Sequence, residues 1–223
     1  MPIRPLLECI RRYEKTWAAG TIPYPGMDLT SEASNAATVA AFAKSGPDCF
    51  SRERPDGHIT GSALVTDPSL SRVLMTHHKR LNKWLQLGGH SDGHPLTWEV
   101  AMREAEEESG LTGLRFQGWF KDRSAYTASQ GQPPEIFDLD YHEIPARKTE
   151  PGHIHYDVRY LIVAPPAGRV VVSEESHDVR WFDLGEAREF TREPSMLRQF
   201  DKLSAVRDAL GGALTHGSIN LRL

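Results

Sequence analysis

The chain has very few cysteines, and this scarcity excludes a fold held together by disulfides. Its 223 residues include only Cys9 and Cys49, which do not form a Cys-x-x-Cys pair. Small secreted domains commonly depend on several disulfides, whereas a reducing compartment keeps thiols free. The cysteine content therefore predicts a cytoplasmic protein.

The chain also lacks long hydrophobic runs and an excess of basic residues. Its apolar residues come in short blocks, far below the roughly 20 consecutive residues that span a bilayer. The N-terminal segment MPIRPLLECIRRYEK has scattered charges and no apolar stretch of the kind that a secretory signal needs. Its 26 lysines and arginines are outnumbered by 30 aspartates and glutamates, whereas a protein that coats nucleic acid needs a basic surface. We therefore expect neither a membrane nor a nucleic acid as a partner.

Helical patterns dominate the first fifty residues. Apolar residues recur at helical spacing over 3–19, and residues 31–44 are rich in alanine, so both segments are predicted to be helices. Neither segment carries a motif that points to chemistry. We treat residues 1–50 as a helical N-terminal extension, which is a candidate contact in a homodimer.

The pattern changes to short β-like runs from Ile59 onward. Helices are predicted only at 95–109 and 194–210, so most strands follow one another directly, which favours an α+β sandwich with a mixed sheet over a doubly wound sheet. We assign residues 51–210 to this domain and 211–223 to a flexible tail. The predicted strands are 59–66, 72–78, 135–144, 153–165, 169–173 and 179–182.

The first of these helices carries three carboxylates at positions where they destabilise it. Glu104, Glu107 and Glu108 are spaced i, i+3, i+4, so they converge within one turn near the helix C-terminus. The helix dipole disfavours an anion there by roughly 0.3–1 kcal/mol. Each like-charged pair adds a penalty of about 0.2–0.5 kcal/mol. A solvated acidic face is one interpretation of this cluster, and an inward-facing site is the other.

The residues flanking that helix favour the inward-facing site. Pro95 suits the first turn of the helix, and Gly110 suits the position just past its end. Together with Gly88 and Gly89 before the helix, they define a loop–helix–loop unit that can turn the carboxylates inward. Clustered oxygen ligands are typical of a site for Mg²⁺ or Mn²⁺.

The segment from Gly89 to Leu111 resembles the Nudix box, Gly-x5-Glu-x7-Arg-Glu-U-x-Glu-Glu-x-Gly-U, in which U is a bulky apolar residue. Two positions depart from it, because Pro95 replaces the first glutamate and Ala105 stands at the first U. The resemblance extends over roughly residues 58–190 and implies a Nudix-type α/β/α sandwich. The matching positions are Gly89, Arg103, Glu104, Glu107, Glu108, Gly110 and Leu111.

The resemblance implies a metal-dependent hydrolase that cleaves a diphosphate linkage in a nucleoside diphosphate derivative, a small-molecule substrate. The three glutamates would bind Mg²⁺ or Mn²⁺, with a backbone carbonyl at Gly88 or Gly89 assisting, and Arg103 would pair with one of them. Divalent cations neutralise phosphate oxygens and activate water, as this reaction requires. The glutamate that Pro95 replaces is not one of the three metal-binding glutamates. The replacement therefore does not by itself remove the metal site, and the resemblance still implies a working enzyme.

The general base is left open between two regions. Glu174 and Glu175 precede the predicted strand 179–182, where family members commonly carry an acidic residue, and Glu175 is our candidate from this loop. Glu107 in the box is the alternative base. The replacement at Pro95 also leaves a second function open, a catalytically weak Nudix-like protein that binds a nucleotide diphosphate as a sensor.

Histidines and aspartates alternate along the two segments FDLDYHEIP and GHIHYDV. If these form a hairpin, six polar side chains line one face, and a symmetric register pairs His142 with His153, Asp140 with His155 and Asp138 with Asp157. That face is interpreted as a solvated surface, a substrate-facing wall or a second metal site. The candidate substrate-binding residues are Arg80, His90 and His155.

Overall fold

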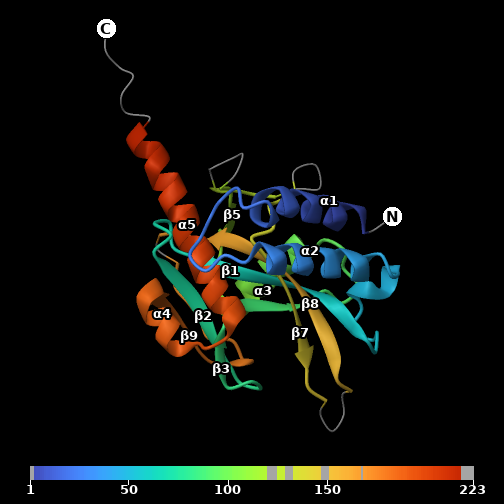
Figure 1. Cartoon of the computed structure of the whole chain (residues 1–223). Helices are drawn as coiled ribbons and strands as arrows, with labels where there is room; N and C mark the ends of the chain where they lie inside the picture. The colour runs from blue at the N-terminus through green and yellow to red at the C-terminus, as the bar shows by residue number, and fades with distance from the viewer. Residues whose placement is uncertain (1–2, 120–124, 129–132, 147–150, 167, 217–223) are drawn as a thin grey trace.

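The computed structural model describes residues 3–119, 125–128, 133–146, 151–166 and 168–216, with only the backbone described for 212–216 (Figure 1). Its helices are α1 (Arg4–Tyr13), the π-helical turn η1 (Glu14–Ala18), α2 (Leu29–Ala43), the 3-10 turn η2 (Pro47–Phe50), α3 (Thr97–Ser109), α4 (Leu184–Phe190) and α5 (Pro194–His216). Its strands are β1 (Gly57–Thr66), β2 (Arg72–His78), β3 (Lys83–Leu85), β4 (Leu87–His90), β5 (Arg115–Gln117), β6 (Ala125–Tyr126), β7 (Asp138–Ile144), β8 (His153–Val163) and β9 (Ser176–Asp183).

The strands form one mixed sheet, as the order of elements predicted. Its main path runs β3-β2-β1-β8-β5-β6, with β4 paired to β1, β7 to β8 and β9 to β2. The long central strands β1 and β8 are parallel, and the other pairs are antiparallel. Strands β4 and β8 both pair with β1, so Gly89, at the start of the box, is separated from β8 by one strand. The α+β prediction is confirmed.

The hairpin of β7 and β8 forms, but the predicted symmetric register is wrong by two residues. His142 pairs with His155, Asp140 with Asp157, and His153 with Ile144. Alternation fixes which side chains share a face, and a two-residue slip leaves that face unchanged, so alternation alone could not fix the register.

The aspartates of this face are held by buried cations rather than by solvent. Arg159 donates to Asp157 at 2.7 Å, to Asp138 at 2.9 Å and to Asp140 at 3.1 Å. Burial alone would raise the pKa of Asp140, but Arg159 and a hydrogen bond with His142 bring it down to about 2. The interpretation as a solvated face is therefore wrong for the aspartates.

The N-terminal helices pack on the same core as the sheet. The apolar residues Leu6, Ile10 and Trp17 are completely or almost completely buried, and they join one continuous hydrophobic cluster with the strands. Figure 1 shows α1 and α2 side by side along one side of the sheet. The apolar face that could have supported a dimer contact is thus used within the chain, while the division into 1–50 and 51–210 stays a prediction.

Three local expectations differ from the structure. Residues 169–173 form no strand, because Val171 instead donates its backbone N–H to the Ser109 carbonyl at the end of α3 and packs over Gly110. Pro95 lies outside α3, whose N-cap is Leu96. Helix α5 continues to His216, six residues past its predicted end, and residues 217–223 of the predicted tail lie outside the described part of the chain. No helix of the described residues is long and apolar enough to cross a membrane.

Candidate active site

Helix α3 holds the predicted carboxylates rigidly because its opposite face and both its ends are fixed. Trp98, Ala101 and Ala105 are buried in the core. At the start of the helix, the Thr97 hydroxyl lies 2.7 Å from the Tyr160 hydroxyl on β8. At its end Gly110 adopts a left-handed conformation with φ of 66° and donates its N–H to a helix carbonyl, as its sequence position predicted.

Strand β4 runs beside α3, and a glycine there makes room for the first carboxylate. A Cβ atom on Gly89 would lie only 2.5 Å from Cδ of Glu104, which is too close for any side chain. The Glu104 carboxylate could move away, but it would then leave its place beside the β4 backbone. The glycine therefore serves the position of Glu104.

Arg103 ties the helix to the end of β4. Its guanidinium donates to Glu104 Oε1 at 2.7 Å and to the His90 carbonyl at 3.1 Å. The sequence predicted that Arg103 pairs with one of the box glutamates, and the partner is Glu104. The side chain of Arg103 thus orients a carboxylate rather than facing solvent alone.

Glu108 is the most deeply buried of the three carboxylates. Only 7% of the residue is exposed, and its Oε2 has no hydrogen-bond partner among the described residues. Burial, with the charges of Glu104, Glu175 and Glu107, raises the pKa of Glu108 to about 8, although the Gly88 N–H donates to it. A buried acceptor without a donor, surrounded by like charges, stays in its charged form at neutral pH only with a cation beside it.

The structure brings Glu175 to the same place from a distant part of the sequence. Burial is the main cause of the raised pKa of Glu104, and the charges of Glu107 and Glu175 raise it further. The loop is held by Lys79, which donates its backbone N–H to the Glu175 carbonyl at 3.1 Å and its ammonium to the Glu174 carbonyl at 2.5 Å. Glu107 itself is exposed at the edge of this group.

These four carboxylates fit a hard divalent cation. All the ligand atoms are oxygens. Two of the four side chains are partly or fully buried, and one buried oxygen has no hydrogen-bond donor among the described residues. Mg²⁺ and Mn²⁺ prefer such carboxylate sets. The residues that would hold the ion are Glu104, Glu107 and Glu108, and Glu175 lies close enough for its charge to act on Glu104 and Glu108.

The candidate substrate-binding residues lie at different distances from this group in the fold. His90 directly follows Gly89, and His155 lies on β8 opposite His58 of β1. Arg80 is exposed in the turn after β2, next to the lysine that anchors the Glu175 loop. Sequence reasoning missed His58, although polar His58, Thr60 and Ser62 alternate with apolar residues along β1 and so give the signal.

Two other features of the fold do not contribute to the carboxylate group. Trp119 and Phe137 are buried in the core with ring centroids 5.5 Å apart, so they cannot stack on a substrate base.

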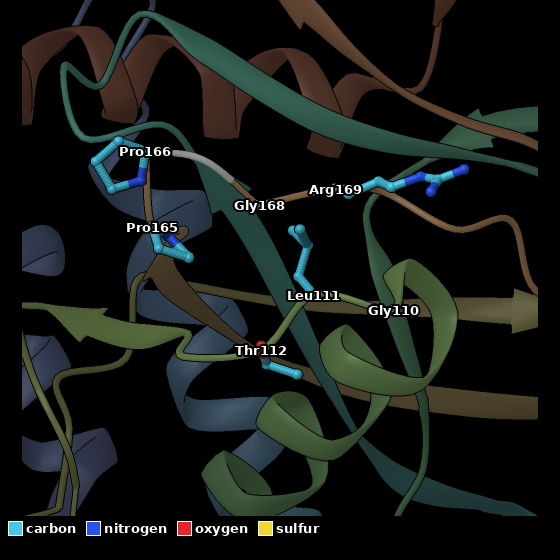
Figure 2. Close-up of a pocket in the computed structure, with 7 residues that line it drawn as sticks. All are labelled: Gly110, Leu111, Thr112, Pro165, Pro166, Gly168 and Arg169. Carbon is cyan, nitrogen blue, oxygen red and sulfur yellow. The ribbon is translucent and has the colours of Figure 1, made fainter.

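An open pocket of about 560 Å³ lies past the end of α3, and Figure 2 shows Leu111 at its centre and Arg169 extending away from the two prolines. Its lining residues are Gly110, Leu111, Thr112, Pro165, Pro166, Gly168 and Arg169, and they include none of the box carboxylates.

A family model described as the NUDIX domain matches residues 58–203, which is more than half of the chain. The chain belongs to the Nudix hydrolase family. The match begins at His58 on β1 and ends on α5, so it includes α3 and all the carboxylates described above. The resemblance inferred from the box is therefore confirmed, and the protein is a Nudix hydrolase.

Comparison with curated proteins gives no match. Among solved structures, this Nudix hydrolase is similar to a C. elegans Ap4A hydrolase in a binary complex, at 17% identity and a TM-score of 0.49, over 66% of this chain and 95% of that chain. A hydrolase of the NUDIX family from Clostridium perfringens shares 20% identity at a TM-score of 0.47, over 66% and 96%. The E. coli dihydroneopterin triphosphate pyrophosphohydrolase shares 15% identity at 0.43, over 73% and 97%. At such low likeness none of these structures indicates a substrate.

Proposed function

We propose that this Nudix hydrolase cleaves a diphosphate linkage in a nucleoside diphosphate derivative, with Mg²⁺ or Mn²⁺ bound by Glu104, Glu107 and Glu108. The observation that carries the proposal is the buried Oε2 of Glu108, which lacks a hydrogen-bond donor and lies among other carboxylates. Such an arrangement disfavours the charged form of Glu108 unless a cation binds there. The free, buried thiols of Cys9 and Cys49 support a cytoplasmic location for the same enzyme.

The residues of the chain divide the remaining work of the reaction. When bound, a divalent cation neutralises the charge of the phosphate oxygens and makes water more acidic. Arg103 keeps Glu104 in place, and Gly89 leaves the space that this carboxylate needs. Glu175 accepts the proton of the water whose oxygen attacks phosphorus, and the bridging oxygen leaves with the other phosphate. Glu107 is the alternative base.

The test is product release from a panel of nucleoside diphosphate derivatives, with Mg²⁺ and Mn²⁺ in separate reactions and products identified by mass. Glu108→Gln keeps the size of the side chain but removes a metal ligand, so turnover should fall at least about 100-fold. Glu106→Gln is the matched control, because Glu106 is an exposed glutamate on the same helix. Its turnover should equal that of the wild type.

Two results would contradict the proposal. Full turnover by Glu108→Gln would separate the reaction from the carboxylate group. No product from any compound, together with ligand-induced thermal stabilisation of the wild type, would instead indicate the binding protein that the replacement at Pro95 left open.

A further inference from the structure

Beside the carboxylates, three strands bring three histidines together. His58 lies on β1, His155 lies opposite it on the parallel strand β8, and His90 ends β4 on the other side of β1. One ring nitrogen from each histidine lies within 4.8 Å of the other two. The ring centroid of His58 lies 5.0 Å from the ring centroid of His90 and 4.6 Å from that of His155.

The central ring of this group lacks the partners that a buried imidazole needs. His58 is 1% exposed, and neither Nδ1 nor Nε2 has a hydrogen-bond partner among the described residues. Buried polar atoms are nearly always hydrogen-bonded, so two orphaned nitrogens on one ring require an explanation. One His58 nitrogen lies near a nitrogen of each of the other two histidines, so a ligand shared by the three rings would give that nitrogen a partner.

The chemistry of the three nitrogens selects one class of ligand. Burial, together with the neighbouring His90 and His153, lowers the pKa of His58 to about 4, so the ring is neutral and its nitrogen can act as a ligand near pH 7. Burial and the surrounding histidines likewise lower the pKa of His155 to about 2. Neutral imidazoles suit Zn²⁺ and related transition metals, whereas Mg²⁺ prefers oxygen donors.

We propose that His58, His90 and His155 form a binding site for a divalent transition-metal ion, with Zn²⁺ as the best-suited ion. Three histidines leave a fourth coordination position open for water or a substrate oxygen. Zn–N bonds of about 2.0–2.1 Å in a tetrahedral site place the nitrogens roughly 3.4 Å apart, so the rings close inward slightly when the ion binds.

Neighbouring side chains define the limits of the site. Asp157 is excluded as a ligand, because it already accepts from Thr60, Ser62 and Arg159. In the loop that follows β4, Asp92 pairs with Arg52 and His94 pairs with Glu99. His153 lies just outside the group, with its Nε2 3.2 Å from Nε2 of His155.

The histidine site and the carboxylate site are separate but adjacent. Gly89 and His90 are consecutive residues, and Arg103 contacts both the His90 carbonyl and Glu104. Metal binding by the histidines does not depend on the proposed hydrolysis, so the two proposals can fail independently.

The test measures Zn²⁺ binding to untagged full-length protein that has been stripped of metal, by competition with a chromophoric chelator and by metal analysis. His90→Gln and His155→Gln each remove one ligand and should weaken Zn²⁺ binding at least about 100-fold, since even supporting residues contribute 10–100-fold. His94→Gln is the matched control from the same loop. Glu108→Gln removes the carboxylate site and should leave this Zn²⁺ affinity unchanged.

Each outcome decides the proposal. One tightly bound Zn²⁺ per chain that is lost in both histidine variants, and kept in His94→Gln and Glu108→Gln, supports the site. Equal affinity in the histidine variants, loss only in Glu108→Gln, or no binding by the wild type overturns it. Circular dichroism checks folding, and if His155→Gln unfolds, His90→Gln decides the question because His90 is only partly buried.

Discussion

Replacing Lys202 with methionine tests how the N-terminal helices are joined to α5 and the sheet. Lys202 is completely buried on α5, and its ammonium lies 2.8 Å from a Glu32 oxygen on α2 and 2.7 Å from an Asp138 oxygen on β7. It also donates to the Tyr13 hydroxyl and lies 4.7 Å from the ring of Trp17. Lys202→Met keeps the length and packing of the chain but removes the cation.

The cost follows from the charges that remain buried. Asp138 keeps Arg159 and Arg198 as partners, whereas Glu32 keeps only tyrosine hydroxyls among the described residues. Breaking a buried ion pair by removing one partner costs about 3–5 kcal/mol in the free energy of unfolding. For a chain of this size, each kcal/mol shifts Tm by about 2–4 °C, so Lys202→Met should lower Tm by about 6–20 °C.

Urea and thermal unfolding followed by circular dichroism measure this loss. The matched control is Lys83→Met, because Lys83 forms an ion pair with Glu193 at the surface, and such pairs contribute about 0–1 kcal/mol. Adding Glu32→Gln to Lys202→Met should recover part of the loss, since it removes the uncompensated charge. A loss below about 1 kcal/mol for Lys202→Met, or one equal to that of Lys83→Met, would refute the reasoning.

Three further predictions concern the carboxylate group and the buried His58. Gly89→Ala should displace the Glu104 carboxylate and weaken Mg²⁺ binding about 10–100-fold, measured by the Mg²⁺ dependence of turnover, with little change in unfolding free energy. Glu175→Gln should lower kcat at saturating Mg²⁺ while the Mg²⁺ affinity holds, and an unchanged kcat would move the base to Glu107. In metal-free protein the lowered pKa of His58 means that the unfolded chain takes up a proton first, so stability should fall by about 1–3 kcal/mol as pH drops from 6.5 towards 4. Urea titrations at stepped pH would show this loss, and a flat profile across that window would contradict it.

The carboxylate group could be predicted because its spacing is local. Glu104, Glu107 and Glu108 lie within about one turn of one helix, and Gly110 ends that helix in the left-handed conformation that its position indicated. The shared face of β7 and β8 followed in the same way from alternation. The register of β7 and β8 could not be predicted in this way, because a shift of two residues leaves the same side chains on the same face.

Contacts between distant segments could not be predicted from local patterns. His58 meets His155 only because β1 and β8 pair in parallel, and Lys202 meets Glu32 across 170 positions of sequence. The valine-rich run 169–173 showed the opposite failure, since its strand preference gives way to packing of Val171 against the end of α3.

The measurement that tests the account most directly is the Mg²⁺ dependence of product release by the wild type and Glu108→Gln, assayed side by side on nucleoside diphosphate derivatives. We expect product only with the divalent ion present, and at least about a 100-fold loss in the variant. Equal turnover by the two proteins, or product formed in excess chelator, would contradict the claim that the buried carboxylates of α3 hold the catalytic cation.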